Sequence, residues 1–289
     1  MADLLSCSAA AVSSRTGPSP LQSITTVVFD LDGVVYRGHT LLPGARKTIA
    51  WLRKQGRRVF FLTNNSTLTR TEYVRRLEEF GIPCKKADVY SSAYACALYL
   101  RENGGASPRA LVVGEGGLSA ELRRVGVDVV RELSGRQVDY VVVGMDRKIN
   151  YRKLVDAHSA IRQGAKFIAS NCDPIYPTED GVIPGGGTIV AAIQTATQTK
   201  PLVIGKPSPY ILKILLHKED IKPKRALLLG DRLDTDVACG RQAGVWTAIV
   251  LTGVTAREEI AAAPARLKPH WVMESIGDLP RLITAEGKP

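Results

Sequence analysis

Residues 27–38 read Val27-Val28-Phe29-Asp30-Leu31-Asp32-Gly33-Val34-Val35-Tyr36-Arg37-Gly38, an apolar strand that runs into two carboxylates and a glycine turn. Because side chains alternate between the two faces of a strand, Asp30 and Asp32 project together from its end. Two such carboxylates repel each other and lose hydration when they are buried. A hard cation is the simplest compensation, and Mg²⁺ binds a few protein carboxylates together with phosphate oxygens. The stretch therefore predicts a magnesium site that meets a phosphate group.

Three more apolar runs end in polar residues. Residues 59–62, 202–204 and 226–229 lead, in that order, into Thr63-Asn64-Asn65-Ser66-Thr67, Gly205-Lys206-Pro207-Ser208-Pro209 and Gly230-Asp231-Arg232-Leu233-Asp234-Thr235-Asp236. The runs are continuously apolar, as in strands of a parallel sheet that is covered on both faces. Open α/β sheets bind ligands at the carboxyl ends of their strands. We therefore expect all four polar clusters to converge at one edge of a single sheet.

In this order the four clusters resemble the motifs of the haloacid dehalogenase-like hydrolase superfamily, most of whose members are phosphatases. These motifs are DxDG, a hydroxyl residue after the second strand, a downstream lysine and GDxxxxD. The fuller segments, with Tyr36-Arg37-Gly38 and Thr63-Asn64-Asn65-Ser66, are similar to the branch of p-nitrophenylphosphatases, phosphoglycolate phosphatases and pyridoxal phosphatases. The resemblance spans roughly residues 25–285. It implies an α/β fold, with a Rossmann-like parallel sheet core of the haloacid dehalogenase type and an inserted α/β cap domain.

The resemblance also implies roles for the two carboxylates of the first motif and for a metal. Asp30 would be the nucleophile that forms an aspartyl-phosphate, and Asp32 the general acid and then the general base. Mg²⁺ would bind Asp30, the backbone carbonyl of Asp32, and Asp231. Asp236 would orient the waters of the metal or the surrounding loop.

Further residues are implied to bind substrate. Thr63 and the backbone N–H of Asn64 would hold phosphoryl oxygens at a helix N-terminus, with Asn65 beside them, and Lys206 would supply a fixed positive charge. Without the resemblance, Thr63-Asn64-Asn65-Ser66 is typical of a helix N-cap, and we expect it to serve as one as well. Dehalogenating members lack the second aspartate, so Asp32 favours phosphoryl chemistry. Thr67 stands where some members of the branch place a basic residue that meets the substrate.

The implied activity is a Mg²⁺-dependent phosphatase acting on small phosphate monoesters, similar to phosphoglycolate phosphatase or 4-nitrophenylphosphatase. Pyridoxal phosphate, nucleotide monophosphates and phosphoproteins remain alternative substrates, and a phosphotransferase an alternative activity on the same scaffold. A non-enzymatic binder of anions or nucleic acid is a third alternative. The complete set of motif residues argues against this last reading.

The pattern of apolar and turn residues predicts four segments: a disordered N-terminal segment over 1–23, a core over 24–106 and 201–289, and an α/β cap over 107–200 between the second and third motifs. We expect core strands at 25–29, 59–62, 247–250 and 271–273 and cap strands at 111–113, 127–130, 140–143 and 167–169. In the cap, Asp173 and Tyr176 are candidates for substrate selection, although the prolines around them would equally shape a turn. The glycines at 185–187 favour the start of a helix.

Composition narrows the partners and the compartment. The net charge is +11, but basic pairs such as Arg75-Arg76 are dispersed and interleaved with acids, which favours a solvated surface over nucleic-acid binding. No apolar run is as long as a membrane span. The 5 cysteines contain no CxxC pair, which favours reduced thiols and a cytoplasmic location. An organellar transit role for the N-terminal segment is the weaker alternative. The resemblance implies pairing of two chains through their caps, so a homodimer is a hypothesis.

Overall fold

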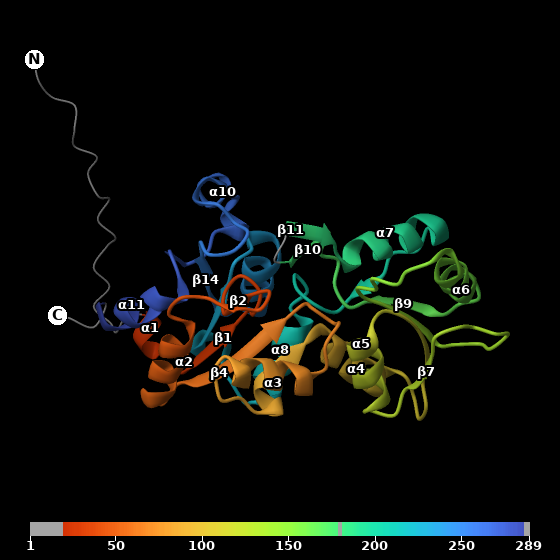
Figure 1. Ribbon diagram of the computed structural model, residues 1–289, viewed down its shortest axis with the longest axis horizontal. Helices are drawn as coiled ribbons and strands as arrows, with labels where there is room; N and C mark the ends of the chain where they lie inside the picture. The colour runs from red at the N-terminus through yellow and green to blue at the C-terminus, as the bar shows by residue number, and fades with distance from the viewer. Residues whose placement is uncertain (1–19, 179–180, 286–289) are drawn as a thin grey trace, which may run out of the picture.

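The computed structural model describes residues 20–178 and 181–285, which form two α/β units side by side (Figure 1). The first unit has a six-stranded sheet in the order β15-β14-β13-β1-β4-β5. All neighbouring strands in it are parallel. The strands are β1 (Thr26–Phe29), β4 (Arg58–Thr63), β5 (Val89–Ser91), β13 (Ala226–Gly230), β14 (Trp246–Val250) and β15 (Trp271–Met273). The strand order reverses between β1 and β13, and such a switch point opens a crevice for ligands.

Helices cover both faces of this sheet, which explains its continuously apolar strands. On one face, Phe29 and Phe61 pack with Leu52 of α2 and Leu77 of α3. On the other, Val28 packs in a cluster with side chains of α4 and α8. The helices of this unit are α2 (Ala45–Lys54), α3 (Arg70–Glu79), α4 (Ser92–Asn103), α8 (Tyr210–Lys218), α9 (Ala238–Ala243), α10 (Arg257–Ala262) and α11 (Leu279–Ala285). A small hairpin, β2 (Tyr36–Arg37) with β3 (Thr40–Leu41), follows the first motif.

The second unit, which we call the cap, has a five-stranded parallel sheet in the order β12-β9-β8-β6-β7. Its strands are β6 (Arg109–Val113), β7 (Asp128–Val130), β8 (Tyr140–Val143), β9 (Lys166–Ala169) and β12 (Leu202–Val203). Its helices are α5 (Gly116–Arg123), α6 (Tyr151–Arg162) and α7 (Gly186–Thr197). An antiparallel hairpin, β10 (Ile175–Thr178) with β11 (Gly181–Pro184), lies over the junction with the core (Figure 1). The predicted α/β fold, with a parallel core sheet and an inserted α/β cap, is therefore confirmed.

One predicted core strand belongs to the cap. We expected residues 202–204 to end at the same sheet edge as β1, but β12 pairs with Ile168 and Ala169 of β9. The apolar run is short, and it shows burial without showing which sheet supplies the partner. The segment after β12 continues along β9, since the N–H of Gly205 donates to Ser170 O at 2.9 Å. Lys206 thus enters the site from the edge of the cap sheet. The domain boundaries we expected stay a prediction.

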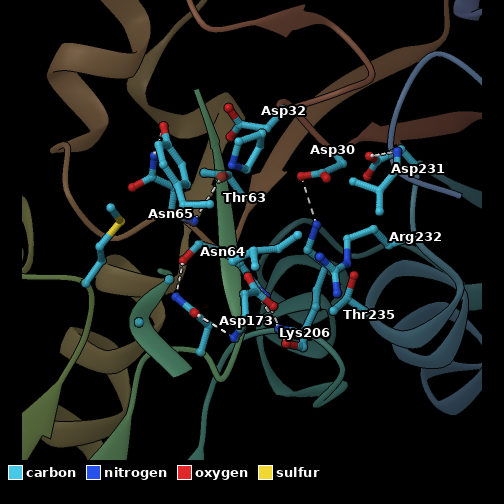
Figure 2. A pocket seen from close by; sticks show the side chains of 18 residues that line it. Asp30, Asp32, Thr63, Asn64, Asn65, Asp173, Lys206, Asp231, Arg232 and Thr235 are labelled. Atoms are coloured by element: carbon cyan, nitrogen blue, oxygen red, sulfur yellow. Dashed lines mark hydrogen bonds and ion pairs between the residues drawn. The ribbon is translucent and has the colours of Figure 1, made fainter. Parts of the chain in front are cut away.

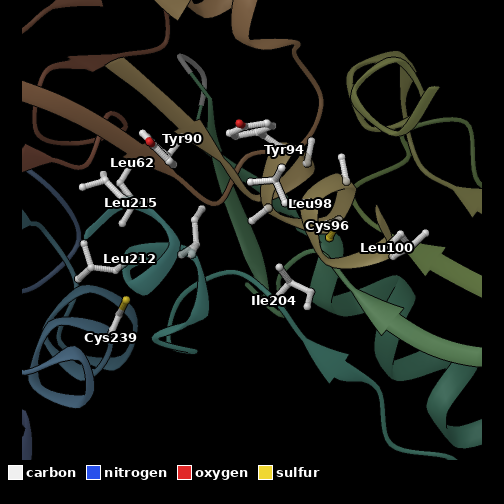
Figure 3. Close-up of a cluster of buried hydrophobic side chains, with 14 of the residues drawn as sticks. Leu62, Tyr90, Tyr94, Cys96, Leu98, Leu100, Ile204, Leu212, Leu215 and Cys239 are labelled. Atoms are coloured by element: carbon white, nitrogen blue, oxygen red, sulfur yellow. The ribbon is translucent and has the colours of Figure 1, made fainter. Parts of the chain in front are cut away.

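A continuous apolar cluster joins the two units (Figure 3). It contains Val28 and Leu62 of the core sheet together with Val112 and Val142 of the cap sheet, and α4 lies between them. The cap helix α5 also contacts the core directly. A Cβ atom on Gly117 would lie 2.5 Å from Thr67 O, so only glycine permits this approach. The cap is therefore packed on the core over both apolar and backbone surfaces.

Two local expectations are wrong. Disorder was expected over 1–23, yet α1 (Pro20–Ser23) is helical and Leu21 is buried in the core, because one apolar side chain is enough to anchor a short segment. Residues 1–19, with their alternative targeting role, lie outside the described residues. Thr63-Asn64-Asn65-Ser66 does not cap a helix either. Instead, α3 begins at Arg70, where Thr69 and Glu72 form a capping box. Among the described helices, none has the length and apolar character needed to cross a membrane.

Candidate active site

Asp30 lies directly beyond β1, at the switch point of the core sheet. Its backbone N–H donates to Leu229 O of β13 at 2.9 Å, which continues the strand pairing and fixes the position of the carboxylate. Gly33 then turns the chain with φ +79°, and a Cβ atom there would lie 2.5 Å from Asp231 Oδ2. Only glycine therefore allows the first motif to fold against the last.

Three buried carboxylates surround one buried ammonium group. Ligand oxygens of Asp30, Asp231 and Asp236 lie within 4.8 Å of one another. Lys206 Nζ is 2.8 Å from Asp30 Oδ1 and 2.6 Å from Asp236 Oδ1. Figure 2 shows Asp30 beside Asp231, with the Lys206 ammonium joined to Asp30 by a dashed line. One ammonium cannot balance three carboxylates, so the cluster keeps an excess of negative charge.

The three carboxylates differ in how much of each remains available to a ligand. Asp236 Oδ1 contacts Lys206, and its Oδ2 accepts from the backbone N–H groups of Asp231 and Arg232 at 3.3 and 3.1 Å. Asp231 Oδ2 accepts from the N–H of Val254 at 2.9 Å, which leaves Oδ1. Asp30 likewise keeps Oδ2. Asp30 and Asp231 are thus better placed than Asp236 to hold a metal ion, because both oxygens of Asp236 already contact Lys206 and the backbone N–H groups of the loop.

Burial dominates the electrostatics of the cluster. It raises the pKa of Asp30 above its ordinary value, although the Lys206 charge opposes the shift. Burial and the charge of Asp236 raise the pKa of Asp231 to about 7. Burial alone would lower the pKa of Lys206, but Asp236 and Asp30 raise it above its usual range. The ammonium therefore stays charged, while the carboxylates are held at a cost that a divalent cation would remove.

Oxygen donors of this kind fit Mg²⁺. The set consists of hard carboxylate oxygens, without a cysteine or a histidine among the residues that line the surrounding cavity. The excess negative charge and the free oxygens of Asp30 and Asp231 point to the same ion. The fit rests on the chemistry of these donors and on their closeness to one another.

The loop after β4 connects the lysine with the cap. The Asn64 side chain forms two hydrogen bonds with the backbone of Lys206. Its Oδ1 accepts from the Lys206 N–H at 2.8 Å, and its Nδ2 donates to the Lys206 carbonyl at 2.9 Å. The same Nδ2 also donates to Asp173 Oδ2 of the cap at 3.0 Å. Asn65 Nδ2 donates to the hydroxyl of Tyr176, also in the cap, at 3.0 Å. Thr63 is buried, and its Oγ1 accepts from the N–H of Asn65 at 3.1 Å.

One cavity brings together nearly all of the predicted site residues. Those that line it are Asp30, Asp32, Thr63, Asn64, Asn65, Asp173, Tyr176, Lys206 and Asp231. Asp236 lies beneath the cavity, against Lys206. The expected helix N-terminus beside Thr63 and Asn64 is absent from the described structure, because the next helix begins only at Arg70. Phosphoryl oxygens would therefore meet the loop itself.

The cavity residues that were not predicted include two with polar side chains held by named partners, Arg232 and Asn171. Arg232 lines it and is held by exposed Asp234, with contacts of 3.0 and 2.7 Å. Asn171 is buried, donates to Asn64 O at 2.7 Å and accepts from the N–H of Asp173 at 3.1 Å. Asn171 follows a parallel strand of the cap, so the rule applied to the core strands would have found it. Arg232 lies inside the GDxxxxD segment, and the motif itself was the available signal.

Comparison with known proteins agrees with this geometry. The model of the haloacid dehalogenase-like hydrolases matches residues 27–128, and a related HAD-hydrolase-like model matches residues 203–279. Human glycerol-3-phosphate phosphatase is 35% identical over 300 residues, which cover 93% of this chain and 94% of that protein. This chain belongs to the haloacid dehalogenase-like hydrolases. The family expected from the four motifs is confirmed.

Other members of the family match over similar lengths. Phosphoglycolate phosphatase 2 of Arabidopsis thaliana is 33% identical and covers 94% of this chain and 97% of its own length. The glycerol phosphate phosphatase of Mycobacterium tuberculosis, solved in complex with magnesium, superposes with a TM-score of 0.83. It is 35% identical, and the match covers 90% of this chain and 78% of that one. These matches cover more of the chain than the two family models do, so they extend into the segment between the models.

Lys206→Met tests the buried charge cluster. It leaves three carboxylates without their cation, and we expect the free energy of unfolding to fall by about 3–5 kcal/mol at pH 8 in EDTA. The uncompensated carboxylates would then have folded-state pKa values above their unfolded ones. The loss should therefore shrink as pH falls towards 5, where protons replace the ammonium. Urea denaturation measures both effects.

Lys213→Met is the matched control, because Lys213 is an exposed lysine of the same chain segment, on α8. Its substitution should change the free energy of unfolding by less than about 0.5 kcal/mol. Equal stabilities of the two variants at pH 8 would contradict the account of Lys206 as the charge that holds the cluster.

Proposed function

We propose that the protein is a Mg²⁺-dependent phosphatase that hydrolyses small phosphate monoesters through an aspartyl-phosphate on Asp30. The observation that carries this proposal is the buried cluster of Asp30, Asp231 and Lys206 at the carboxyl end of the core sheet. The relatives named above support it, because their names are those of phosphatases and one was solved with magnesium.

In the first step, Asp30 attacks phosphorus and the bond from phosphorus to the ester oxygen breaks. Lys206 Nζ contacts Oδ1 of Asp30 at 2.8 Å and so holds the attacking carboxylate in place. The ammonium group also lies where charge builds up on the phosphoryl oxygens, and a fixed charge in a buried site needs no reorganisation during the reaction. Thr63 and the backbone after it would bind the remaining phosphoryl oxygens.

Asp32 supplies and then removes the proton. Burial raises the pKa of Asp32 to about 6, so part of the population carries a proton near neutral pH. This proton passes to the leaving oxygen. In the second step Asp32 takes a proton from water as the water oxygen attacks the aspartyl-phosphate, the bond from phosphorus to Asp30 breaks, and inorganic phosphate forms.

The metal would be held by Asp30, Asp231 and the backbone carbonyl of Asp32. When bound, Mg²⁺ would offset the repulsion between the carboxylates and the phosphate that must meet there. Asp236 would keep the Asp231 loop in place, because both of its oxygens are already engaged by Lys206 and backbone N–H groups.

The cap favours a small substrate. Asp173, Ile175, Tyr176 and Gly186 of the cap line the same cavity as Asp30, so they lie over the reacting carboxylate. A substrate must fit beneath them, which favours metabolites such as phosphoglycolate over phosphoproteins. Asn64 donates to Asp173 and Asn65 donates to Tyr176. Held in this way, Asp173 and Tyr176 would select among small esters. Pyridoxal phosphate and nucleotide monophosphates are the alternative substrates to compare.

Asp30→Asn tests the chemistry with p-nitrophenyl phosphate as substrate. Without its nucleophile the enzyme should lose at least about 10³-fold in kcat. Wild-type activity should disappear in EDTA and return with Mg²⁺. Acid quenching during turnover, followed by peptide mass spectrometry, should place a phosphoryl group on Asp30.

Asp220→Asn is the control, because Asp220 is exposed and has φ +50°, a conformation that asparagine accepts. It should keep wild-type activity. Turnover that survives Asp30→Asn would reject covalent catalysis at this residue.

We also propose a homodimer that forms through the cap. Three apolar side chains near the start of α6 are exposed, namely Ile149 at 38%, Tyr151 at 80% and Val155 at 43%. Burying them against a second copy would remove this apolar surface from water.

Tyr151→Glu should convert the dimer to a monomer in size-exclusion chromatography with light scattering. Val272→Glu, at an exposed apolar residue of the core, should leave the dimer intact, and a purely monomeric wild type would contradict the proposal.

A cytoplasmic location is proposed from the cysteines. Cys84, Cys96, Cys172 and Cys239 are all free in the part of the chain that the structure describes. Free thiols are typical of a reducing compartment. Fractionation of cells that produce the full chain should recover it with cytosolic markers, and recovery within an organelle would support the targeting alternative.

A further inference from the structure

A second cavity adjoins the candidate active site. Asn65, Met145, Tyr176 and Pro177 line both cavities, so the two lie on either side of these residues. Arg76 and Arg147 also line the second cavity. A substrate whose phosphate sits at Asp30 can therefore extend towards two guanidinium groups.

The two arginines are not equally available. Arg147 is held by Glu115 through contacts of its Nε and Nη2 at 2.7 Å each, so its charge is already balanced. Arg76 forms no ion pair with a carboxylate of the described residues, and its guanidinium lies over the ring of Tyr36 at 5.3 Å. A partly buried arginine without a carboxylate partner is the better anion receptor, because its fork of donors matches carboxylate and phosphate groups.

Arg76 also lies near the group that meets the leaving oxygen. Burial raises the pKa of Asp32 to about 6, and the positive charge of Arg76 is the first to oppose this rise, ahead of Lys206. Burial raises the pKa of the Tyr176 hydroxyl to about 12, and the positive charges of Arg76 and Arg147 both oppose this rise. The charge of Arg76 therefore acts on Asp32, which lines the active-site cavity, and on Tyr176, which lines both cavities.

We propose that Arg76 binds a second anionic group of the substrate, a few atoms from the phosphate ester, and so makes the enzyme prefer phosphate monoesters of hydroxy acids or other anionic alcohols. This inference rests on the proposed phosphatase function and adds its substrate class. A third cavity, which Asp32 lines, is less suitable for an anion. Its arginine, Arg37, already donates to Thr252 O, and its walls include the exposed apolar side chains of Val182 and Val254.

The test compares two substrates that differ in one charge. 2-Phosphoglycolate carries a carboxylate, whereas 2-hydroxyethyl phosphate has nearly the same size and a neutral hydroxyl group. The wild type should show the higher kcat/KM with phosphoglycolate. Arg76→Gln should lower the ratio of the two kcat/KM values by about ten- to a hundredfold, as expected for the loss of a charge-assisted hydrogen bond. Arg76→Lys should retain part of the preference.

The ratio separates this role from others. Any effect of Arg76 on Asp32 or on folding would change both substrates together and leave the ratio unaltered. Arg75→Gln is the matched control, because Arg75 is the adjacent arginine of α3 and is exposed; it should keep the wild-type ratio. An unchanged ratio in Arg76→Gln, or equal turnover of the two substrates by the wild type, would overturn the inference.

A second measurement does not require turnover of the anionic substrate. Phosphonoacetate and methylphosphonate, which cannot be hydrolysed, should compete with p-nitrophenyl phosphate. Phosphonoacetate should be the better inhibitor of the wild type, and Arg76→Gln should remove most of that advantage. Failure of the wild type to hydrolyse p-nitrophenyl phosphate at all would refute the phosphatase proposal, whereas normal hydrolysis with equal inhibition by the two phosphonates would refute only the role of Arg76.

Discussion

The buried ammonium of Lys206 is the group on which the site depends. It contacts Asp30 from the end of β1 and Asp236 from the turn after β13, and these strands are neighbours in the core sheet. The lysine itself arrives on a segment that has just left the cap sheet. None of these charges would be stable in a buried place alone, because desolvation would exceed any single attraction. The ion cluster therefore forms only when the core sheet and the return from the cap are both in place.

The convergence of the motifs could be predicted because parallel strands place their carboxyl ends on one edge. This rule was enough for Asp30, Asp32 and Asp231, whose positions depend on strand order and little else. It failed for residues 202–204, because an apolar run reports burial and not the identity of the neighbouring strand. The separate expectation that Thr63-Asn64-Asn65-Ser66 caps a helix is wrong, since the capping box of Thr69 and Glu72 lies six residues further on.

The residues that sequence reasoning missed act through tertiary contacts. Arg75-Arg76 was interpreted as part of a solvated surface, and that interpretation holds for Arg75, which is exposed. Successive residues of a helix point about 100° apart, so Arg76 faces the Tyr36 ring and the second cavity instead. Nothing in the pair itself distinguishes the two arginines. The distinction comes from which face of α3 packs on the loop after β1, and that is decided by the core.

The cap and the phosphoryl site share their supporting contacts, and this has a chemical consequence. Asn64 holds the backbone of Lys206 and the carboxylate of Asp173 with one amide group. A shift of the cap would therefore move the Lys206 ammonium, which we propose stabilises the phosphoryl group, as well as the cap residues that line the cavity. The apolar cluster that spans both sheets, with Leu62 and Val142 among its members, resists such a shift. If the proposed mechanism holds, recognition of the leaving group and stabilisation of the phosphate are parts of one packed arrangement, in which a change in the cap alters the geometry around Asp30.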